Sequence, residues 1–132
     1  MKFPPDIKVY GDLSYRDKRC PLEVAEQMTF FNRVRKTEYG AIATHIRNEG
    51  KRNNAMKERM EGMTPGASDI IIPARVPFVC EMKRRDHTLC HWQAGQLDYL
   101  RAAQDMGAFA IVALGVDAAW EAFQEWILTT KN

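Results

Sequence analysis

Apolar residues follow two different spacings along this chain of 132 residues, and the spacing predicts the elements. Short runs of apolar and β-branched residues between turn formers predict strands, whereas apolar residues that recur every three or four positions predict helices. The predicted strands are residues 41–46, 69–72, 78–83 and 109–114, with a weak candidate at 7–10. The predicted helices are residues 21–38, a segment from 53 or 54 to 60, residues 90–106, and a last segment that begins at Asp117.

The order of these elements predicts the class of fold. Helix, strand, helix, two strands, helix, strand and helix in succession indicate an α/β protein with a mixed β-sheet flanked by helices. Pro73 and Pro77 bound a short turn, so the runs on either side of it should form a hairpin. The length suits one domain over residues 1–132, in which residues 1–20 form an N-terminal arm or an edge element.

The predicted hairpin carries the chemistry of interest. Asp69 opens its first strand, and Glu81 and Lys83 lie near the end of the second, so all three should lie at the same end of the sheet. Side chains alternate between faces along a strand, so Glu81 and Lys83 project together while Met82 points away. Two carboxylates beside a lysine are suited to a hydrated divalent metal next to a phosphate.

An aspartate followed by Glu-x-Lys on a hairpin resembles the core of the PD-(D/E)XK phosphodiesterase superfamily. The wider context, over about residues 22–127, is similar to the VRR-NUC (virus-type replication-repair nuclease) branch. The residues that carry this similarity are Gly66, Asp69, the run Phe78 to Lys83, Gln96 and the pair Gly107-Ala108. Ser68 stands where that branch usually has a proline. The resemblance implies a restriction-endonuclease-like core and a Mg²⁺-dependent nuclease.

The resemblance also implies roles for single residues. The catalytic residues would be Asp69, Glu81, Lys83 and Gln96. The ligands of Mg²⁺ or Mn²⁺ would be Asp69, Glu81, the main-chain carbonyl of Met82 and a glutamate of the first helix. Lys83 would polarise or orient the attacking water.

The first helix offers two candidates for that glutamate. Glu23 lies on one stripe with Gln27, Phe30 and Phe31 by helical spacing, which directs it inward. Glu26 is predicted to lie nearer to solvent. The spacing of Glu23 and Gln27 is similar to a Glu-x-x-x-Gln pattern in the resembled branch, so Glu23 is favoured, with Glu26 as the alternative.

The net charge of +2 does not by itself indicate a nucleic-acid partner, but the distribution of charge does. Residues 33–59 contain eight Lys or Arg and three Glu, whereas residues 102–130 contain four acids and no Lys or Arg. We therefore predict one basic and one acidic surface. The predicted DNA contacts are Asn48, Lys51, Arg52 and Arg84, the first three in a turn that could hold a phosphate.

Other features of the sequence bound the function. The sequence shows no secretory signal and no apolar run long enough for a membrane span, so we expect a cytoplasmic protein, of phage or prophage origin by the resemblance, without membrane contact. The three cysteines are expected to stay reduced. A zinc site of Cys80, His87, Cys90 and His91 is disfavoured, because Cys80 lies in a predicted buried strand. His87 and His91 are expected to be surface groups.

Two other functions remain open alongside a DNA endonuclease. One is a catalytically weak DNA-binding module with a nuclease fold, and the other is a metal-dependent nucleotide phosphohydrolase. Single-domain viral members of the resembled branch suggest a homodimer that cuts branched DNA such as Holliday junctions. We expect Trp120, Phe123, Trp126 and Ile127 of the last helix either to form the dimer interface or to pack on the sheet.

Overall fold

The computed structural model describes residues 1–47 and 55–131 of the chain. Its strands are β1 (Lys8–Tyr10), β2 (Thr44–His45), β3 (Ile70–Ile72), β4 (Phe78–Lys83) and β5 (Phe109–Leu114). Its α-helices are α1 (Glu23–Val34), α2 (Ala55–Met60), α3 (Gln96–Asp105) and α4 (Val116–Lys131), with short 3₁₀ turns at Glu38–Ala41 and His87–Leu89. The predicted order of elements is confirmed, and the weak strand candidate at residues 7–10 corresponds to β1.

The described strands form one five-stranded mixed sheet in the order β1-β5-β4-β3-β2. β3 and β4 pair antiparallel as the predicted hairpin, with Ile70 opposite Cys80, whereas β4 and β5 are parallel. β4 lies in the middle of the sheet and is buried along its whole length. β1, within the segment expected to be an arm or an edge element, pairs parallel with β5 as an edge strand.

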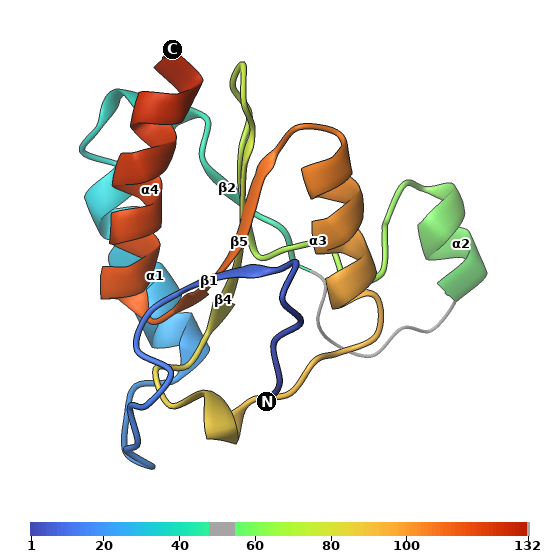
Figure 1. The fold of residues 1–132 in the computed structure, drawn as a ribbon. Helices are drawn as coiled ribbons and strands as arrows, with labels where there is room; N and C mark the ends of the chain where they lie inside the picture. The colour runs from blue at the N-terminus through green and yellow to red at the C-terminus, as the bar shows by residue number, and fades with distance from the viewer. Residues whose placement is uncertain (48–54, 132) are drawn as a thin grey trace.

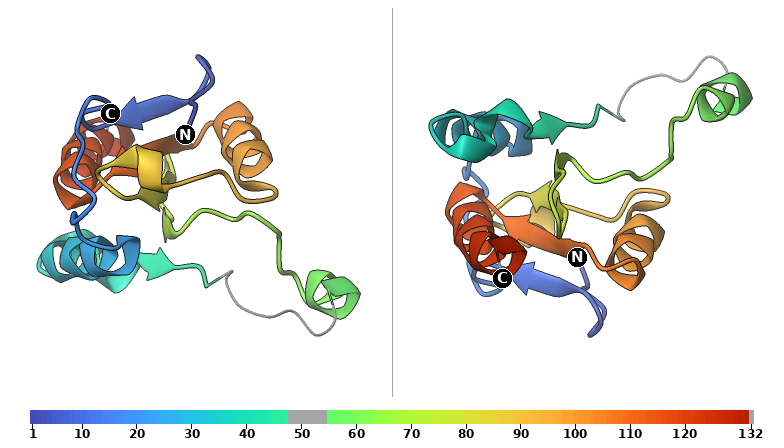
Figure 2. Two further views of the ribbon diagram at one scale, coloured as in Figure 1. Left: turned by 90° about the horizontal axis from the view of Figure 1, so that it is seen from below. Right: turned by 90° about the horizontal axis from the view of Figure 1, so that it is seen from above.

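Helices cover both faces of this sheet (Figure 1). α1 and α4 lie on one face and α3 lies on the other, and both views of Figure 2 show the same three layers. Side chains along β5 point alternately to the two faces of the sheet. Ile111 and Ala113 belong to the core under α1 and α4, while Val112 and Leu114 belong to the core under α3. The expected α/β fold with a mixed sheet flanked by helices is therefore confirmed.

The core under α1 and α4 is rich in aromatic side chains. Phe30 of α1 stacks on Phe78 of β4 with ring centroids 6.2 Å apart. Phe123 and Trp126 of α4 are fully buried there, and the Trp126 indole donates a hydrogen bond to the Val76 carbonyl at 2.6 Å. Phe123 and Trp126 therefore pack on the sheet, one of the two expected roles, while Trp120 and Ile127 are only partly buried against the same core.

Several details differ from the predictions. Residues 90–95 precede α3 and are not helical, because Gly95 takes a left-handed conformation that begins the helix at Gln96. The α4 helix begins at Val116, one residue before Asp117, and the Val116 N–H donates a hydrogen bond to the Glu26 side chain. Met56 and Met60 in the second predicted helical segment are 76% and 83% exposed, so neither contributes to the core. They lie on α2, which projects from the body in Figure 2.

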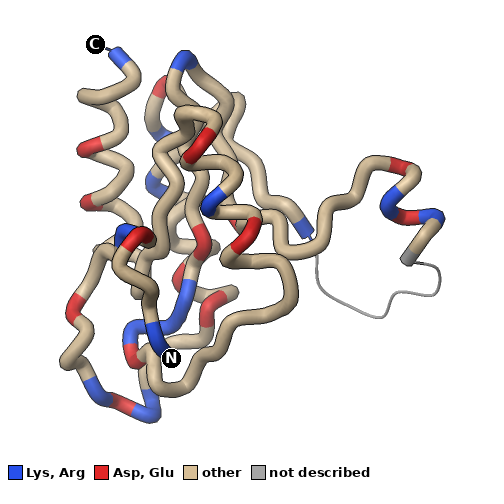
Figure 3. Tube along the Cα trace, turned by 45° about the vertical axis from the view of Figure 1, so that its right-hand side comes forward, with Lys and Arg blue, Asp and Glu red and all other residues tan. Residues whose placement is uncertain are grey.

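The described cations of residues 33–59 do not gather on one surface. Arg33 and Arg35 lie at the end of α1, whereas Lys57 and Arg59 lie on α2 on the other side of the molecule (Figure 1). Figure 3 shows acidic and basic residues interspersed on α2, the helix that projects from the body. The prediction of a single basic surface is therefore wrong for the part of the chain that the structure describes. No helix in that part is long and apolar enough to cross a membrane.

Candidate active site

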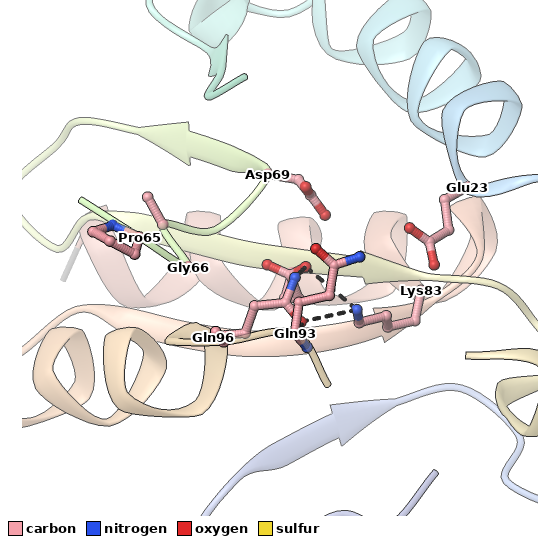
Figure 4. Close-up of a pocket in the computed structure, with 10 residues that line it drawn as sticks. Glu23, Pro65, Gly66, Asp69, Lys83, Gln93 and Gln96 are labelled. Carbon is pink, nitrogen blue, oxygen red and sulfur yellow. Dashed lines mark hydrogen bonds and ion pairs between the residues drawn. The ribbon is translucent and has the colours of Figure 1, made fainter. Parts of the chain in front are cut away.

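The ends of β3 and β4 bring the three predicted residues of the hairpin together. Glu81 and Lys83 leave β4 on the α3 side of the sheet, while Met82 points into the opposite core. Asp69 comes directly before β3, and its Oδ2 accepts a hydrogen bond from the Met82 N–H at 2.9 Å. All three residues line one cavity of about 300 Å³ (Figure 4). The convergence predicted from strand alternation is therefore present.

Gln96, the first residue of α3, links the acid to the lysine. Its Nε2 donates to Glu81 Oε1 at 2.8 Å, and its Oε1 accepts from Lys83 Nζ at 3.0 Å. The Gln93 N–H donates to the same Oε1 at 2.9 Å, which identifies this atom as the amide oxygen. Gln96 thus orients both Glu81 and Lys83, as the dashed lines in Figure 4 show in part.

Two glycines hold α3 against the loop that leads to Asp69. Gly66 and Gly95 both have positive φ angles, of 79° and 86°. A methyl group on Gly66 would lie 2.1 Å from the Gly95 carbonyl carbon, and one on Gly95 would lie 2.6 Å from the Pro65 oxygen. Only glycine allows this close main-chain approach, so the pair determines how near Gln96 lies to Glu81. Gly66 belonged to the predicted motif, whereas Gly95 was missed.

The cavity holds its charges in a largely desolvated setting. Lys83 Nζ lies 3.7 Å from Glu81 Oε1, and the side chains are 3% and 2% exposed. Burial raises the pKa of the Glu81 carboxyl well above its usual value, and the negative charge of Asp69 raises it further. Burial also raises the pKa of Asp69. Two neighbouring acids that are both costly to ionise favour a bound cation or proton between them.

One atom of the cavity lacks a partner among the described residues. Glu81 Oε2 is buried and accepts no hydrogen bond from any of them. A buried carboxylate oxygen without a donor is costly in free energy, and a metal ion is one group that removes that cost. Asp69 and Glu81 supply the hard oxygen ligands that Mg²⁺ and Mn²⁺ prefer, so the residues present fit such an ion.

The first helix contributes one glutamate to this cavity. Glu23, at the start of α1, is half-buried and lines the cavity beside Asp69 and Lys83, and Figure 4 shows its carboxylate reaching the same space. Its Oε1 accepts a hydrogen bond from the Cys90 thiol at 3.5 Å. Within the described residues, no group of three or more His, Cys, Asp or Glu side chains is arranged to hold a metal ion, so Asp69 and Glu81 would need other ligands beside them. The Met82 carbonyl and water would have to complete the coordination.

Glu26 faces elsewhere, and the predicted orientation of the helix is wrong in this respect. The buried stripe of α1 runs through Glu26, Phe30 and Val34, so Glu26 lies in the interior at 4% exposure. Its Oε2 accepts the hydrogen bond from the Val116 N–H that begins α4, and its Oε1 lies 3.4 Å from Arg85 Nε. Glu26 therefore caps the start of α4.

The predicted DNA contacts are only partly described by the structure. Asn48, Lys51 and Arg52 lie outside the described residues. Arg84 follows β4 and donates hydrogen bonds to the carbonyls of Cys20 and Pro21 at 2.6 and 3.2 Å. Part of its hydrogen-bonding capacity is therefore used to fix the segment that precedes α1. Its contact with DNA stays a prediction. His87, considered earlier as a zinc ligand, instead packs edge-on against Phe3.

Sequence reasoning missed the segment before α3. The His91 carbonyl accepts a hydrogen bond from Lys83 Nζ at 3.3 Å, and the Trp92 ring lies 5.9 Å from that nitrogen. The Trp92 indole donates to the Lys2 carbonyl at 2.8 Å, which ties the N-terminal arm to this segment. The signal was concealed because a helix had been predicted across residues 90–95, and a helix would have used the His91 carbonyl in its own main-chain hydrogen bonds.

Comparison with known proteins supports the fold. Neither family models nor curated proteins match the sequence. Among solved structures, a protein described as a VRR_NUC domain protein matches with a TM-score of 0.69 at 19% sequence identity. The match covers 83% of this chain and 90% of the other. At this identity the likeness concerns the fold, and the resemblance drawn from the hairpin motif is confirmed at that level: the chain has a VRR-NUC-like fold.

Proposed function

We propose that this chain is a metal-dependent endonuclease that hydrolyses phosphodiester bonds in DNA. One observation carries the proposal: Asp69, Glu81 and Lys83 line a single cavity in which a buried oxygen of Glu81 has no partner among the described residues. A purely structural ion pair would be expected to satisfy both carboxylate oxygens. The VRR-NUC-like fold supports the same function by analogy.

Each residue has a distinct part in the proposed mechanism. Asp69 and Glu81, with the Met82 carbonyl and Glu23, would hold Mg²⁺ or Mn²⁺. The ion would supply positive charge that activates water and stabilises charge on the phosphate. Lys83 donates to Gln96 and His91, which orient its ammonium group beside Glu81. In this position Lys83 can orient the attacking water or stabilise the phosphate oxygen.

Glu81→Gln tests the proposal most directly. The substitution keeps the size of the side chain but removes a negative charge at the metal site, so we expect cleavage to fall by about 10³-fold or more, the loss seen when transition-state stabilisation of about 4 kcal/mol is removed. The assay follows a plasmid, short oligonucleotides and free nucleotides with Mg²⁺, Mn²⁺ or a chelator. Lys36→Ala, on the exposed segment after α1, is the control and should cleave normally.

The same assay separates the alternatives. Hydrolysis of nucleotides without cleavage of polymers would indicate a nucleotide phosphohydrolase. Binding of DNA without cleavage under any metal would indicate a binding module. Undiminished cleavage by the chelated protein, or by Glu81→Gln, would contradict the proposed metal site.

We further propose that two copies act together on branched DNA, such as four-way junctions. The described part of the chain contains one acid cavity of this kind, and paired cuts require two such cavities, which a twofold homodimer would provide. Light scattering at tens of micromolar and a comparison of junctions with linear duplexes test this proposal. A monomeric mass with equal cleavage of both substrates would refute it without affecting the nuclease assignment.

A further inference from the structure

A second hollow adjoins the acid cavity. It has a volume of about 410 Å³ and shares Glu23 and Asp69 with that cavity. The rest of its lining comes from the start of α1 and the residue before it, from β2 and the second residue after it, and from the residue that follows β4: Leu22, Val24, Gln27, His45, Arg47 and Arg84. We call this hollow the β2 groove. Because it shares two lining residues with the acid cavity, an extended ligand bound over the acids can continue into it.

The β2 groove carries positive charge that the acid cavity lacks on its other side. Arg84 is held in place by its hydrogen bonds to two main-chain carbonyls before α1. Arg47 is exposed, and no hydrogen bond or ion pair joins it to any residue within 1–47 or 55–131. Apart from Lys83 and the acids, the acid cavity is lined by uncharged residues, and Figure 4 shows two of them, Pro65 and Gly66, on the side away from Glu23. The two sides of the site thus differ in charge.

His45 ties the wall of the β2 groove to the acid cavity. Its Nδ1 lies 2.8 Å from the main-chain oxygen of Asp69, and the Ile46 N–H donates to the same oxygen at 2.9 Å. Because a carbonyl oxygen only accepts, Nδ1 carries the proton, and the ring is held at a set angle to Asp69. The position of Arg47, two residues along, is therefore coupled to that of the acid.

We propose that the β2 groove is a nucleotide subsite that binds the phosphate next to the one that is cut. The inference rests on the proposed function and extends it. Arg47 makes the direct contact, Arg84 adds charge at the far wall, and His45 keeps the subsite in register with Asp69. A nucleic-acid strand carries one negative charge per phosphate, so the exposed Arg47 beside the acid cavity suits the phosphate that follows. The uncharged opposite side gives the strand a preferred direction.

The test measures binding separately from cleavage. A fluorescent single-stranded DNA oligonucleotide is titrated with Glu81→Gln, and the anisotropy gives Kd at several salt concentrations. Adding Arg47→Ala should weaken binding about 5- to 10-fold and reduce the slope of log Kd against log salt by about 0.7, the loss of one phosphate contact. Adding Lys36→Ala instead should leave the slope unchanged, because Lys36 lies beyond the other end of α1.

A chemical probe sharpens the assignment. Oligonucleotides with one neutral methylphosphonate at successive positions should show a single position at which wild-type affinity falls and Arg47→Ala causes no further loss. If Arg47→Ala alters the salt slope no more than Lys36→Ala, the subsite is wrong even where cleavage is normal. If the unsubstituted chain neither binds nor cleaves any nucleic acid, the proposed function fails and the subsite fails with it.

Discussion

Two buried glutamates lie near the end of β4, each within a cluster of charged groups, and they differ in how well their charges are satisfied. In the first, Glu26 accepts from the Val116 N–H and pairs with Arg85, which also pairs with Asp117 at 3.1 Å. In the second, Glu81 lies beside another acid and leaves one oxygen without a described partner. The first cluster begins α4 and holds α1 against it. In the second cluster, a ligand that binds the unpartnered oxygen of Glu81 would stabilise the folded protein.

The comparison shows how buried acids can be separated into structural and functional ones. Burial alone does not distinguish them, because Glu26 and Glu81 are 4% and 1% exposed. The difference lies in the partners: a cation and a helix N–H complete one site, whereas a lysine shared with a glutamine only partly compensates the other. We therefore expect substitutions in the two clusters to affect different measurements.

The largest contrast is expected between Lys83, which lies beside Glu81, and Arg85, which pairs with Glu26. Lys83→Ala should slow the chemical step by about 10²-fold or more, roughly 3 kcal/mol of transition-state stabilisation, with little change in DNA affinity. Single-turnover cleavage at saturating DNA measures this step.

Arg85→Ala is the matched control for Lys83→Ala. It should lower the melting temperature and leave the rate per folded molecule unchanged, because Arg85 contacts Glu26 and Asp117 outside the acid cavity. If Lys83→Ala lost binding but kept its rate, Lys83 would only clamp the phosphate.

The two glutamates of α1 provide the second contrast. Glu23→Gln should reduce cleavage about tenfold or more, because Glu23 lines the acid cavity. Its melting temperature should be unchanged, because the Glu23 side chain is only half-buried. Glu26→Gln should instead lower the free energy of unfolding by about 1–3 kcal/mol, since it weakens hydrogen bonding to a charged group at the start of α4.

Chemical denaturation and cleavage, measured on the same preparations, check both glutamate variants. A stable Glu26→Gln protein without activity would reverse the assignment of the two residues.

The smallest effect is expected for the stability of Asp69→Asn. Burial raises the pKa of Asp69, so its charged form opposes folding at neutral pH, and the amide can still accept from the Met82 N–H. The metal-free variant should therefore melt about 3–5 °C higher, the shift that about 1 kcal/mol produces in a domain of this size. Differential scanning calorimetry measures it.

Mn²⁺ provides the complementary measurement for Asp69→Asn. It should raise the melting temperature of the unsubstituted protein, because it binds the folded state, and have little effect on the variant. An equal response of both proteins to Mn²⁺ would exclude Asp69 as a ligand.

The sequence alone predicted those parts of the site that depend on local rules. Side-chain alternation along β4 placed Glu81 and Lys83 on one face, and the hairpin turn placed Asp69 at the same end of the sheet. The apolar runs of β4 and β5 are long enough to identify central strands. The order of elements then predicted the class of fold, because few topologies accommodate it.

Only the tertiary structure decided how the remaining residues are used. The spacing of Glu23 and Glu26 is compatible with either facing inward, and the packing of α1 against α4 decided that Glu26 caps a helix while Glu23 reaches the cavity. The contact of Gly66 with Gly95 joins residues 29 positions apart, so no local pattern reveals it. The β2 groove likewise exists because α1, β2 and the end of β4 meet there. Such contacts depend on the packing of segments distant in sequence, which hydrophobic periodicity does not encode.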